Sequence, residues 1–168
     1  MVIWYLLSCK EQEEQRTLDS CRNYLSETAL RDAFILTYDR MCRYQGAWHL
    51  EKKLLFPAYV ILESENASIL RDELTQYKGI LGKAQAVLEI NPKEEKFLRV
   101  LCGKRNHIRM SRGVICKGVT QVTEGPLKGM EARICKIDRH KRLAKLRVQE
   151  GHDSRYIPAG LEIVEKSI

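Results

Sequence analysis

Runs of apolar residues mark four segments of the first hundred positions as strands. Residues 3–7 and 54–62 are almost continuously aromatic or aliphatic, and residues 33–38 and 87–90 are shorter runs of the same kind. Such runs are typical of strands buried in a sheet. Pro57 cannot donate a ladder hydrogen bond, so we expect it at the start of its strand or at an irregularity.

Three segments between and after these strands instead repeat their apolar residues at helical intervals. Their apolar positions are Leu18, Cys21, Tyr24 and Leu25; Ile69, Leu70, Leu74 and Tyr77; and Phe97, Leu98 and Leu101. Ser8 and Glu11 have the spacing of a capping box ahead of the first helix. Asn66 is a candidate cap for the second helix, and Asn91 with Pro92 for the third.

The resulting order is β-α-β-β-α-β with a last short helix, and Gly46 marks the turn of a hairpin. This order predicts an α+β fold, a small sandwich of helices on an antiparallel sheet, for residues 1–103. Residues 104–109 are basic and without period, which indicates a linker. Residues 110–168 read as strands without a helix and predict a compact β-barrel.

The segment 119–148 contains a turn and a hairpin. Gly125 and Gly129 can adopt positive φ and allow close approach of backbones, while Pro126 fixes its own φ, so these residues predict a tight connection between strands. Two apolar-alternating runs follow, with residues 139–142 between them. We expect this Arg-His-Lys-Arg cluster at the tip of a hairpin.

Composition excludes several classes of protein. The 168 residues are 44% hydrophobic with a mean hydropathy of −0.36, and they contain neither an 18-residue apolar run nor a signal-peptide pattern. We therefore expect a cytoplasmic monomer without membrane contact. The six cysteines form no Cys-x-x-Cys pair, so we expect no metal site and no cofactor. Five of them, Cys9, Cys21, Cys42, Cys116 and Cys135, lie in apolar-patterned segments and are interpreted as small hydrophobic residues.

The charge is concentrated in the carboxy-terminal part. Residues 1–103 carry a net charge of −1 and residues 104–168 a net charge of +8. This asymmetry favours a nucleic-acid-binding second part and a first part that contacts something else, although isolated surface lysines and arginines are ordinary.

The turn and hairpin resemble the KOW motif of the NusG family of transcription elongation factors. The match is to V-x-x-G-P-x-x-G-x-x-A-x-I, carried by Val122, Gly125, Pro126, Gly129, Ala132 and Ile134. The amino-terminal part is similar to the NusG amino-terminal domain through Trp4 and Tyr5, and through Lys53, Phe56, Pro57, Tyr59 and Val60, where the family form is K-x-F-P-G-Y-V. Ribosomal proteins also carry KOW motifs, and the two matches in the expected order decide for NusG.

The chain also departs from the family pattern. Ala58 replaces the usual glycine, and because alanine has a Cβ we expect a backbone conformation with φ < 0 at this position. The chain resembles specialised paralogues of the LoaP and UpxY kind in three features: a shorter linker, a more basic second part and the sequence at residues 157–166. Of these two kinds we prefer LoaP, an antiterminator.

The resemblance implies that the first part binds the clamp helices of RNA polymerase. Tyr5, Phe56, Pro57 and Tyr59 would form the contact, with Tyr59 equally interpretable as a core residue. Asn66 and Ser68 lie where relatives touch non-template DNA, a further implied partner.

A nascent RNA hairpin is the partner expected for the second part. Hairpin recognition rests on the resemblance to LoaP, whereas the density of cations itself predicts affinity for phosphate. The RNA-binding candidates are Lys117, Lys128, Arg133, Lys136, Arg139, His140, Lys141, Arg142, Lys145, Arg147 and Arg155. Arg139, Arg142 and Arg147 are candidates for base contacts, and Lys145 and Arg147 should share one strand face.

These features predict an antitermination factor that binds polymerase and nascent RNA. A general NusG-type factor that couples polymerase to the ribosome and a translation-side KOW protein are the alternatives. We expect no catalysis, because the four histidines lie in polar or basic segments without a nucleophile or carboxylate pattern.

Overall fold

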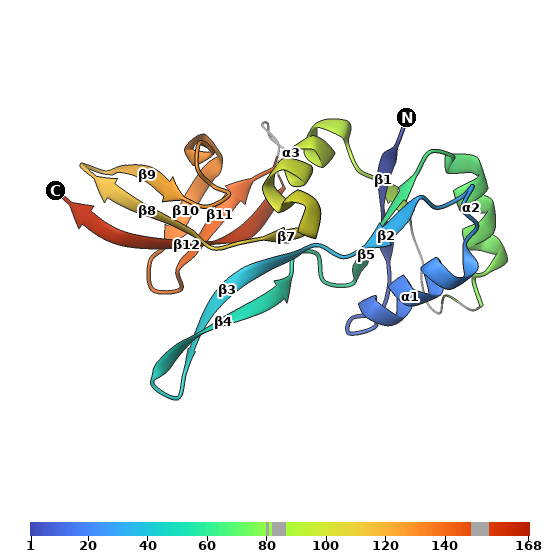
Figure 1. Ribbon diagram of the computed structural model, residues 1–168, viewed down its shortest axis with the longest axis horizontal. Helices are drawn as coiled ribbons and strands as arrows, with labels where there is room; N and C mark the ends of the chain where they lie inside the picture. Colours follow the sequence, from blue (N-terminus) through green and yellow to red (C-terminus); the bar gives the residue numbers. More distant parts are fainter. Residues whose placement is uncertain (80, 82–86, 149–154) are drawn as a thin grey trace. The chain divides into compact units, whose positions relative to one another are not determined.

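A computed structural model describes residues 1–79, 81, 87–148 and 155–168 (Figure 1). Its contacts divide the chain into two compact units. Unit 1 comprises Met1–Leu36 and Phe56–Glu95, and unit 2 comprises Thr37–Leu55 and Lys96–Ile168. Helices and sheets are both present, as the predicted α+β class requires. The division into domains at residues 103 and 110 stays a prediction, and residues 104–109 contain a 3-10 turn and a short strand.

Unit 1 is built on a four-stranded antiparallel sheet of order β2-β5-β1-β6. Its elements are β1 (Ile3–Ser8), α1 (Glu14–Tyr24), β2 (Asp32–Phe34), β5 (Tyr59–Ser64), α2 (Ala67–Gln76) and β6 (Val87–Glu89). The core between sheet and helices includes Leu18 and Cys21 of α1, Leu70 and Leu74 of α2, and Leu62 of β5. The predicted antiparallel sheet with two amphipathic helices is therefore confirmed for this part of the chain.

Unit 2 contains two sheets. A three-stranded sheet has the order β4-β3-β7, from β3 (Thr37–Tyr44), β4 (Ala47–Leu54) and β7 (His107–Ile108). A five-stranded sheet has the order β10-β11-β12-β8-β9. Its strands are β8 (Ser111–Cys116), β9 (Val119–Glu124), β10 (Ile134–Asp138), β11 (Leu143–Arg147) and β12 (Tyr156–Ser167). Within the described ranges no ladder joins β9 to β10, so closure into a barrel stays a prediction.

The remaining helical elements are α3 (Pro92–Cys102) and two 3-10 turns, η1 (Gly103–Arg105) and η2 (Glu131–Arg133). Two predicted caps are confirmed. Oδ1 of Asn66 accepts from the N–H of Ile69 at 3.1 Å, and Oδ1 of Asn91 accepts from the N–H of Lys93 at 2.9 Å. Both caps are formed with residues two or three positions away in the sequence, so a local sequence pattern is sufficient to predict them.

The predicted capping box at Ser8 is wrong, because Ser8 is the last residue of β1 and α1 begins at Glu14. The backbone N–H of Cys9 donates to the carbonyl of Ala58 at 2.9 Å and keeps the chain beside β5 for one more residue. The expectation of φ < 0 at Ala58 is also wrong, since its φ is +68°. The interpretation of Cys116 and Cys135 as packed hydrophobic residues fails because both are exposed.

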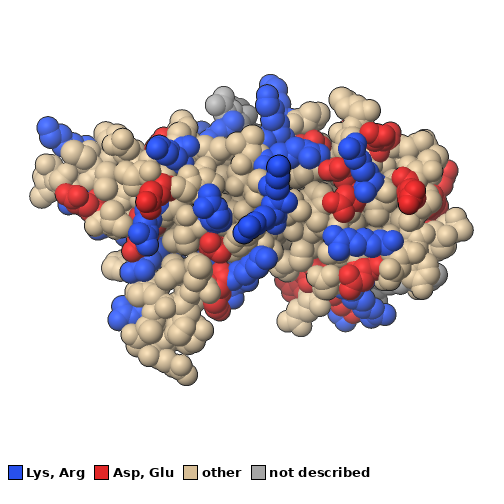
Figure 2. Space-filling view, in the orientation of Figure 1, with Lys and Arg blue, Asp and Glu red and all other residues tan. Residues whose placement is uncertain are grey.

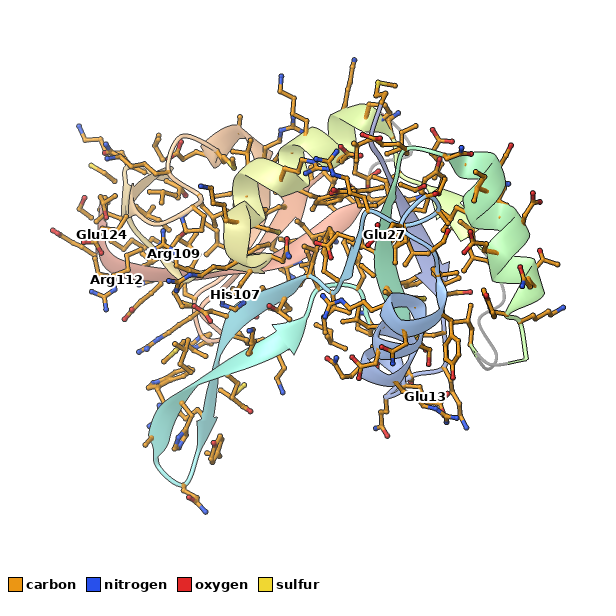
Figure 3. The ribbon with its side chains drawn as sticks, turned by 45° about the vertical axis from the view of Figure 1, so that its right-hand side comes forward. Glu13, Glu27, His107, Arg109, Arg112 and Glu124 are labelled. Atoms are coloured by element: carbon orange, nitrogen blue, oxygen red, sulfur yellow. The ribbon has the colours of Figure 1, made fainter. Side chains whose placement is uncertain are left out.

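Three polar side chains of unit 2 fix β7 beside β3. Nε2 of His107 lies 2.7 Å from Oδ1 of Asp39, and Nδ1 lies 2.7 Å from Oγ1 of Thr37. Oδ2 of Asp39 accepts from the N–H of Met110 at 3.0 Å. Figure 3 labels His107, from which the chain continues into β8 and Arg112, whose register partner on β9 is Glu124.

Candidate nucleic-acid interface

The β10–β11 hairpin carries the basic cluster at its tip, as predicted. Residues 139–142 form the turn between the two strands. Oδ1 of Asp138 accepts from the N–H of Lys141 at 3.0 Å. That hydrogen bond, with smaller contributions from the Lys141 charge and the His140 backbone, lowers the pKa of Asp138 below its ordinary value of 3.8. The turn is thus closed by an ionised carboxylate at neutral pH.

Strand register places like charges directly opposite each other on the exposed side of this hairpin. Lys136 of β10 is the partner of Lys145 on β11, and Lys145 is the partner of Pro158 on β12. Arg147 pairs with Tyr156 in the neighbouring row. Lys145 and Arg147 are exposed whereas Leu146 and Val148 are buried, so the predicted alternation is confirmed. Opposed lysines repel each other, and an anion between them relieves that repulsion.

Tyr156 completes a groove on this face of the hairpin. Its side chain is 47% exposed, and Nζ of Lys145 lies 4.3 Å from the centroid of its ring. The groove has a volume of about 320 Å³. Its lining residues are Lys136, Asp138, Lys141, Leu143, Ala144, Lys145, Tyr156, Ile157 and Pro158. We call these residues the tyrosine groove, a site that combines an exposed ring with three ammonium groups.

The other residues of the hairpin tip, Arg139, His140 and Arg142, line a second groove. It has a volume of about 570 Å³, and Lys136, Ile137, Asp138, Arg139, His140, Arg142, Glu162 and Ile163 line it. Glu162 lies among these cations, with its Oε1 3.6 Å from a guanidinium nitrogen of Arg142. This groove therefore has a less positive lining than the sequence alone indicates.

Two of the predicted RNA-binding arginines are engaged with their own chain. The guanidinium of Arg142 lies 4.1 Å from the ring centroid of Trp48, in addition to its contact with Glu162. That of Arg133 lies 4.9 Å from the ring centroid of Phe97 and donates to the carbonyl of Val148 at 3.0 Å. Both side chains are half-buried. They stabilise unit 2, and their role in RNA binding stays a prediction.

The other predicted cations are exposed. They are Lys117, Lys128, Lys136, Arg139, His140, Lys141, Lys145, Arg147 and Arg155. Lys117 lies in the β8–β9 turn and Lys128 in the turn after β9, and neither lines the tyrosine groove. Of the predicted cations, Lys136, Lys141 and Lys145 thus line one groove together with Tyr156.

The tight turn predicted at residues 125–129 is present, and both of its glycines have positive φ, whereas its assignment to a KOW motif stays a prediction. Gly125 and Gly129 have φ values of +98° and +83°. A Cβ on Gly125 would lie 2.5 Å from Oγ of Ser111 and 2.8 Å from the carbonyl oxygen of Met110, so only glycine fits. The Ser111 hydroxyl also accepts from the N–H of Leu127, which is fully buried one residue after Pro126.

The predicted polymerase-contact residues occupy different environments in unit 1. Pro57 is exposed, Phe56 and Tyr59 are half-buried, and Tyr5 is only 2% exposed within the core. Burial raises the pKa of Tyr5 above its ordinary 10.0, which agrees with this position. Tyr5 is therefore not available on the surface. Asn66 is occupied as a helix cap, and Ser68 is exposed on α2.

Sequence reasoning missed Tyr156 and Trp48. Tyr156 directly follows Arg155, so an aromatic residue flanked by a cation was the available signal. Trp48 lies on β4, in a hairpin that also exposes Tyr44 and Leu50. Figure 2 shows this hairpin as largely uncharged on the visible face. Trp48 gave no local signal, because its contact with Arg142 joins residues far apart in the sequence.

Among the described residues, no three His, Cys, Asp or Glu side chains are grouped so that they could hold a metal ion. No helix in the described ranges has the length and apolar character needed to span a membrane.

No protein-family model matches the chain, and no curated protein matches it. Several solved structures show similarity to the chain. One, described as domain interaction in Thermotoga maritima NusG, has 15% identity and a TM-score of 0.47, and the alignment covers 97% of this chain and 94% of that one. Another is a divalent cation tolerance protein from Thermus thermophilus, with 14% identity, a TM-score of 0.30, and coverage of 54% of this chain and 81% of that one. With TM-scores below 0.5, neither similarity assigns a function to this chain.

Proposed function

We propose that this chain is a transcription elongation factor with antitermination activity, which binds RNA polymerase through unit 1 and nascent RNA through the β10–β11 hairpin. The tyrosine groove is the observation that supports RNA binding most directly. Three ammonium groups beside an exposed aromatic ring are the combination with which proteins hold single-stranded nucleic acid. The motif resemblance to NusG supports the transcription context.

Electrostatics favours a polyanion at this surface. Lys136 and Lys145 face each other across two strands, and Lys141 stands at the turn beside them. Each phosphate that such a side chain neutralises releases counterions, so affinity falls steeply with salt. An unpaired RNA loop exposes its bases and its phosphates together, and it fits a groove of this composition better than a regular duplex does.

Unit 1 contributes the proposed polymerase contact. Phe56 and Pro57 lie in the turn that precedes β5, with Pro57 exposed and Phe56 half-buried. Aromatic anchors of this kind commonly dominate modest protein interfaces. We leave Tyr5 out of the contact because it is buried in the core. The proposal is one of binding without catalysis.

Charge reversal of the groove tests the RNA-binding part. The full chain with Lys136→Glu and Lys145→Glu should bind a fluorescent leader RNA hairpin at least tenfold more weakly than the parent at 150 mM salt. The matched control, Lys10→Glu with Lys78→Glu, changes the net charge equally on two exposed lysines of unit 1. Equal losses in the two variants would overturn a role for the groove.

Transcription in vitro tests the activity. RNA polymerase reading through a terminator should gain read-through when the parent chain is present and the leader hairpin lies upstream. The groove variant should lose this gain, whereas the control variant should keep it. Read-through that is equal with and without the leader would instead favour a general elongation factor.

A further inference from the structure

Asp138 is an unexpected member of the tyrosine groove. It is a carboxylate among lysines, and its charge weakens general attraction for phosphate. Its hydrogen bond to the N–H of Lys141 requires one acceptor oxygen, which a neutral asparagine would also supply. The closure of the turn therefore does not explain why this position carries a negative charge.

A carboxylate retains acceptor positions beyond those used in the turn. It offers about four lone-pair sites, the backbone groups of Lys141 and His140 use only some of them, and Asp138 lines the groove. An aspartate is ionised at neutral pH, and the hydrogen bond from Lys141 lowers its pKa further, so Asp138 accepts hydrogen bonds there and donates none.

Guanine is the RNA base that matches such an acceptor. Its N1–H and its 2-amino group are adjacent donors on the Watson–Crick edge, and both can bind one carboxylate. Adenine, cytosine and uracil each have an acceptor directly beside the donor of that edge, so none of them offers two adjacent donors to one carboxylate. The edge is accessible only when the base is unpaired, and a groove of about 320 Å³ has room for one nucleotide rather than a helix.

Tyr156 and Lys145 supply the other two contacts that a base needs. The ring of Tyr156 is exposed and can stack on a purine, and the ammonium of Lys145 now covers it at 4.3 Å. Lys145 is itself exposed, so it can leave the ring for the phosphate of an entering nucleotide. Its partner Lys136 lies directly opposite and can share that phosphate.

From this arrangement we propose that the tyrosine groove selects an unpaired guanine in RNA, with Asp138 binding the Watson–Crick edge, Tyr156 stacking on the base, and Lys136 and Lys145 holding the phosphate. This inference rests on the proposed RNA-binding function and names the base that the site recognises.

Fluorescence anisotropy with the full chain tests the proposal. The probes are RNA hairpins with one stem and a seven-nucleotide adenosine loop, whose central position is guanosine, inosine or adenosine. Guanosine should bind about tenfold more tightly than adenosine. Inosine, which keeps N1–H and lacks the 2-amino group, should fall between them. Equal affinity for all three loops would overturn the proposal and leave RNA binding by the groove intact.

Asp138→Asn is the decisive variant. Asparagine keeps the oxygen that accepts from Lys141, and it replaces the second oxygen by a donor, a pattern that suits adenine. The variant should lose the preference for guanosine while its affinity for the adenosine loop rises. The control Glu165→Gln removes an equal charge from an exposed position of β12 and should raise affinity for all loops alike. An unchanged guanosine preference in Asp138→Asn would refute the assignment.

Two further measurements separate the possible failures. Tyr156→Phe should retain binding, whereas Tyr156→Leu should lose about tenfold for the guanosine loop. Guanosine monophosphate should compete only at millimolar concentration, and micromolar competition would identify a free nucleotide as the ligand instead. If the parent binds none of the loops, the proposed RNA-binding function itself fails.

Discussion

The backbone N–H of Ala58 donates to Oε2 of Glu14 at 2.9 Å, so the first residue of α1 holds the turn that leads into β5. Glu14 is 5% exposed, so this hydrogen bond lies within the packed part of unit 1. Ala58, which donates this hydrogen bond, has a φ of +68°, a backbone conformation that L residues rarely adopt. The strain is maintained because hydrogen bonds from Ala58 to Glu14 and from Cys9 to Ala58 fix the peptide on both sides.

Ala58→Gly should therefore stabilise the chain. Glycine removes the cost of the left-handed conformation, about 1–2 kcal/mol, and part of the gain is lost to the greater freedom of the unfolded chain. We expect a net increase of about 0.5–1 kcal/mol in the free energy of unfolding, measured by urea denaturation. Ala47→Gly, at an exposed strand position without positive φ, should instead destabilise. A loss of stability in both variants would contradict the strain at Ala58.

Phe56 and Pro57 test the polymerase contact. Phe56→Ala should weaken binding to RNA polymerase by about 1–3 kcal/mol if Phe56 is an anchor. Because Phe56 is half-buried, Pro57→Glu is the cleaner variant: it places a charge on an exposed position and should weaken binding without altering the circular dichroism spectrum. Leu88→Ala, at an exposed apolar position of β6, is the control. Polymerase binding that survives Pro57→Glu would remove this turn from the interface.

The salt dependence of RNA binding distinguishes free from engaged cations. Lys141→Ala should reduce the slope of log affinity against log salt by about 0.7–0.9, because Lys141 is exposed and is proposed to contact a phosphate. Arg142→Ala should leave the slope nearly unchanged and lower stability by about 1 kcal/mol, because its guanidinium lies over Trp48 and beside Glu162. Equal slopes for the two variants would place Arg142 on the RNA.

Glu131 gives unit 2 a predictable response to acid. Hydrogen bonds from its own backbone N–H and from those of Val122 and Gly129 lower its pKa below 4.5, against a smaller opposing effect of burial. Between the folded and unfolded pKa values the unfolded chain binds more protons, so stability falls as pH falls through that interval. The stability difference between parent and Glu131→Gln should be largest above pH 4.5 and should shrink on acidification. A constant difference from pH 6 to pH 3 would contradict this.

Local chemistry explains which features the sequence could predict. The caps at Asn66 and Asn91 and the positive φ of Gly125 depend on residues within a few positions, and all three were predicted correctly. The start of α1 and the conformation of Ala58 depend on a contact between segments about fifty residues apart, which no local pattern contains.

The candidate site follows the same rule. Alternation along β11 predicted that Lys145 and Arg147 would share a face. The pairing that sets Lys136 opposite Lys145 depends on a bulge in β10, and the position of Tyr156 depends on the β11–β12 register. Both are properties of the assembled sheet, so the cations were predictable while the groove that they form with Tyr156 was not.

Gly125 and Gly129, in the turn after β9, should respond differently to the same substitution. Both have positive φ, so alanine at either position carries the backbone cost of about 1–2 kcal/mol. At Gly129 nothing lies within 4 Å of the added Cβ, and that cost is the whole effect. At Gly125 the Cβ would meet Cα of Ser111 at 2.7 Å, which forces β8 away from the turn.

We therefore expect Gly125→Ala to destabilise the chain by at least about 2 kcal/mol more than Gly129→Ala, as measured by thermal unfolding. The extra loss should come with exposure of Leu127, because its N–H donates to the Ser111 hydroxyl that the new methyl group would displace. Faster hydrogen exchange at the Leu127 amide in Gly125→Ala, and not in Gly129→Ala, would locate the damage at this contact. Equal losses in the two variants would mean that backbone conformation alone, and not close approach to β8, requires glycine here.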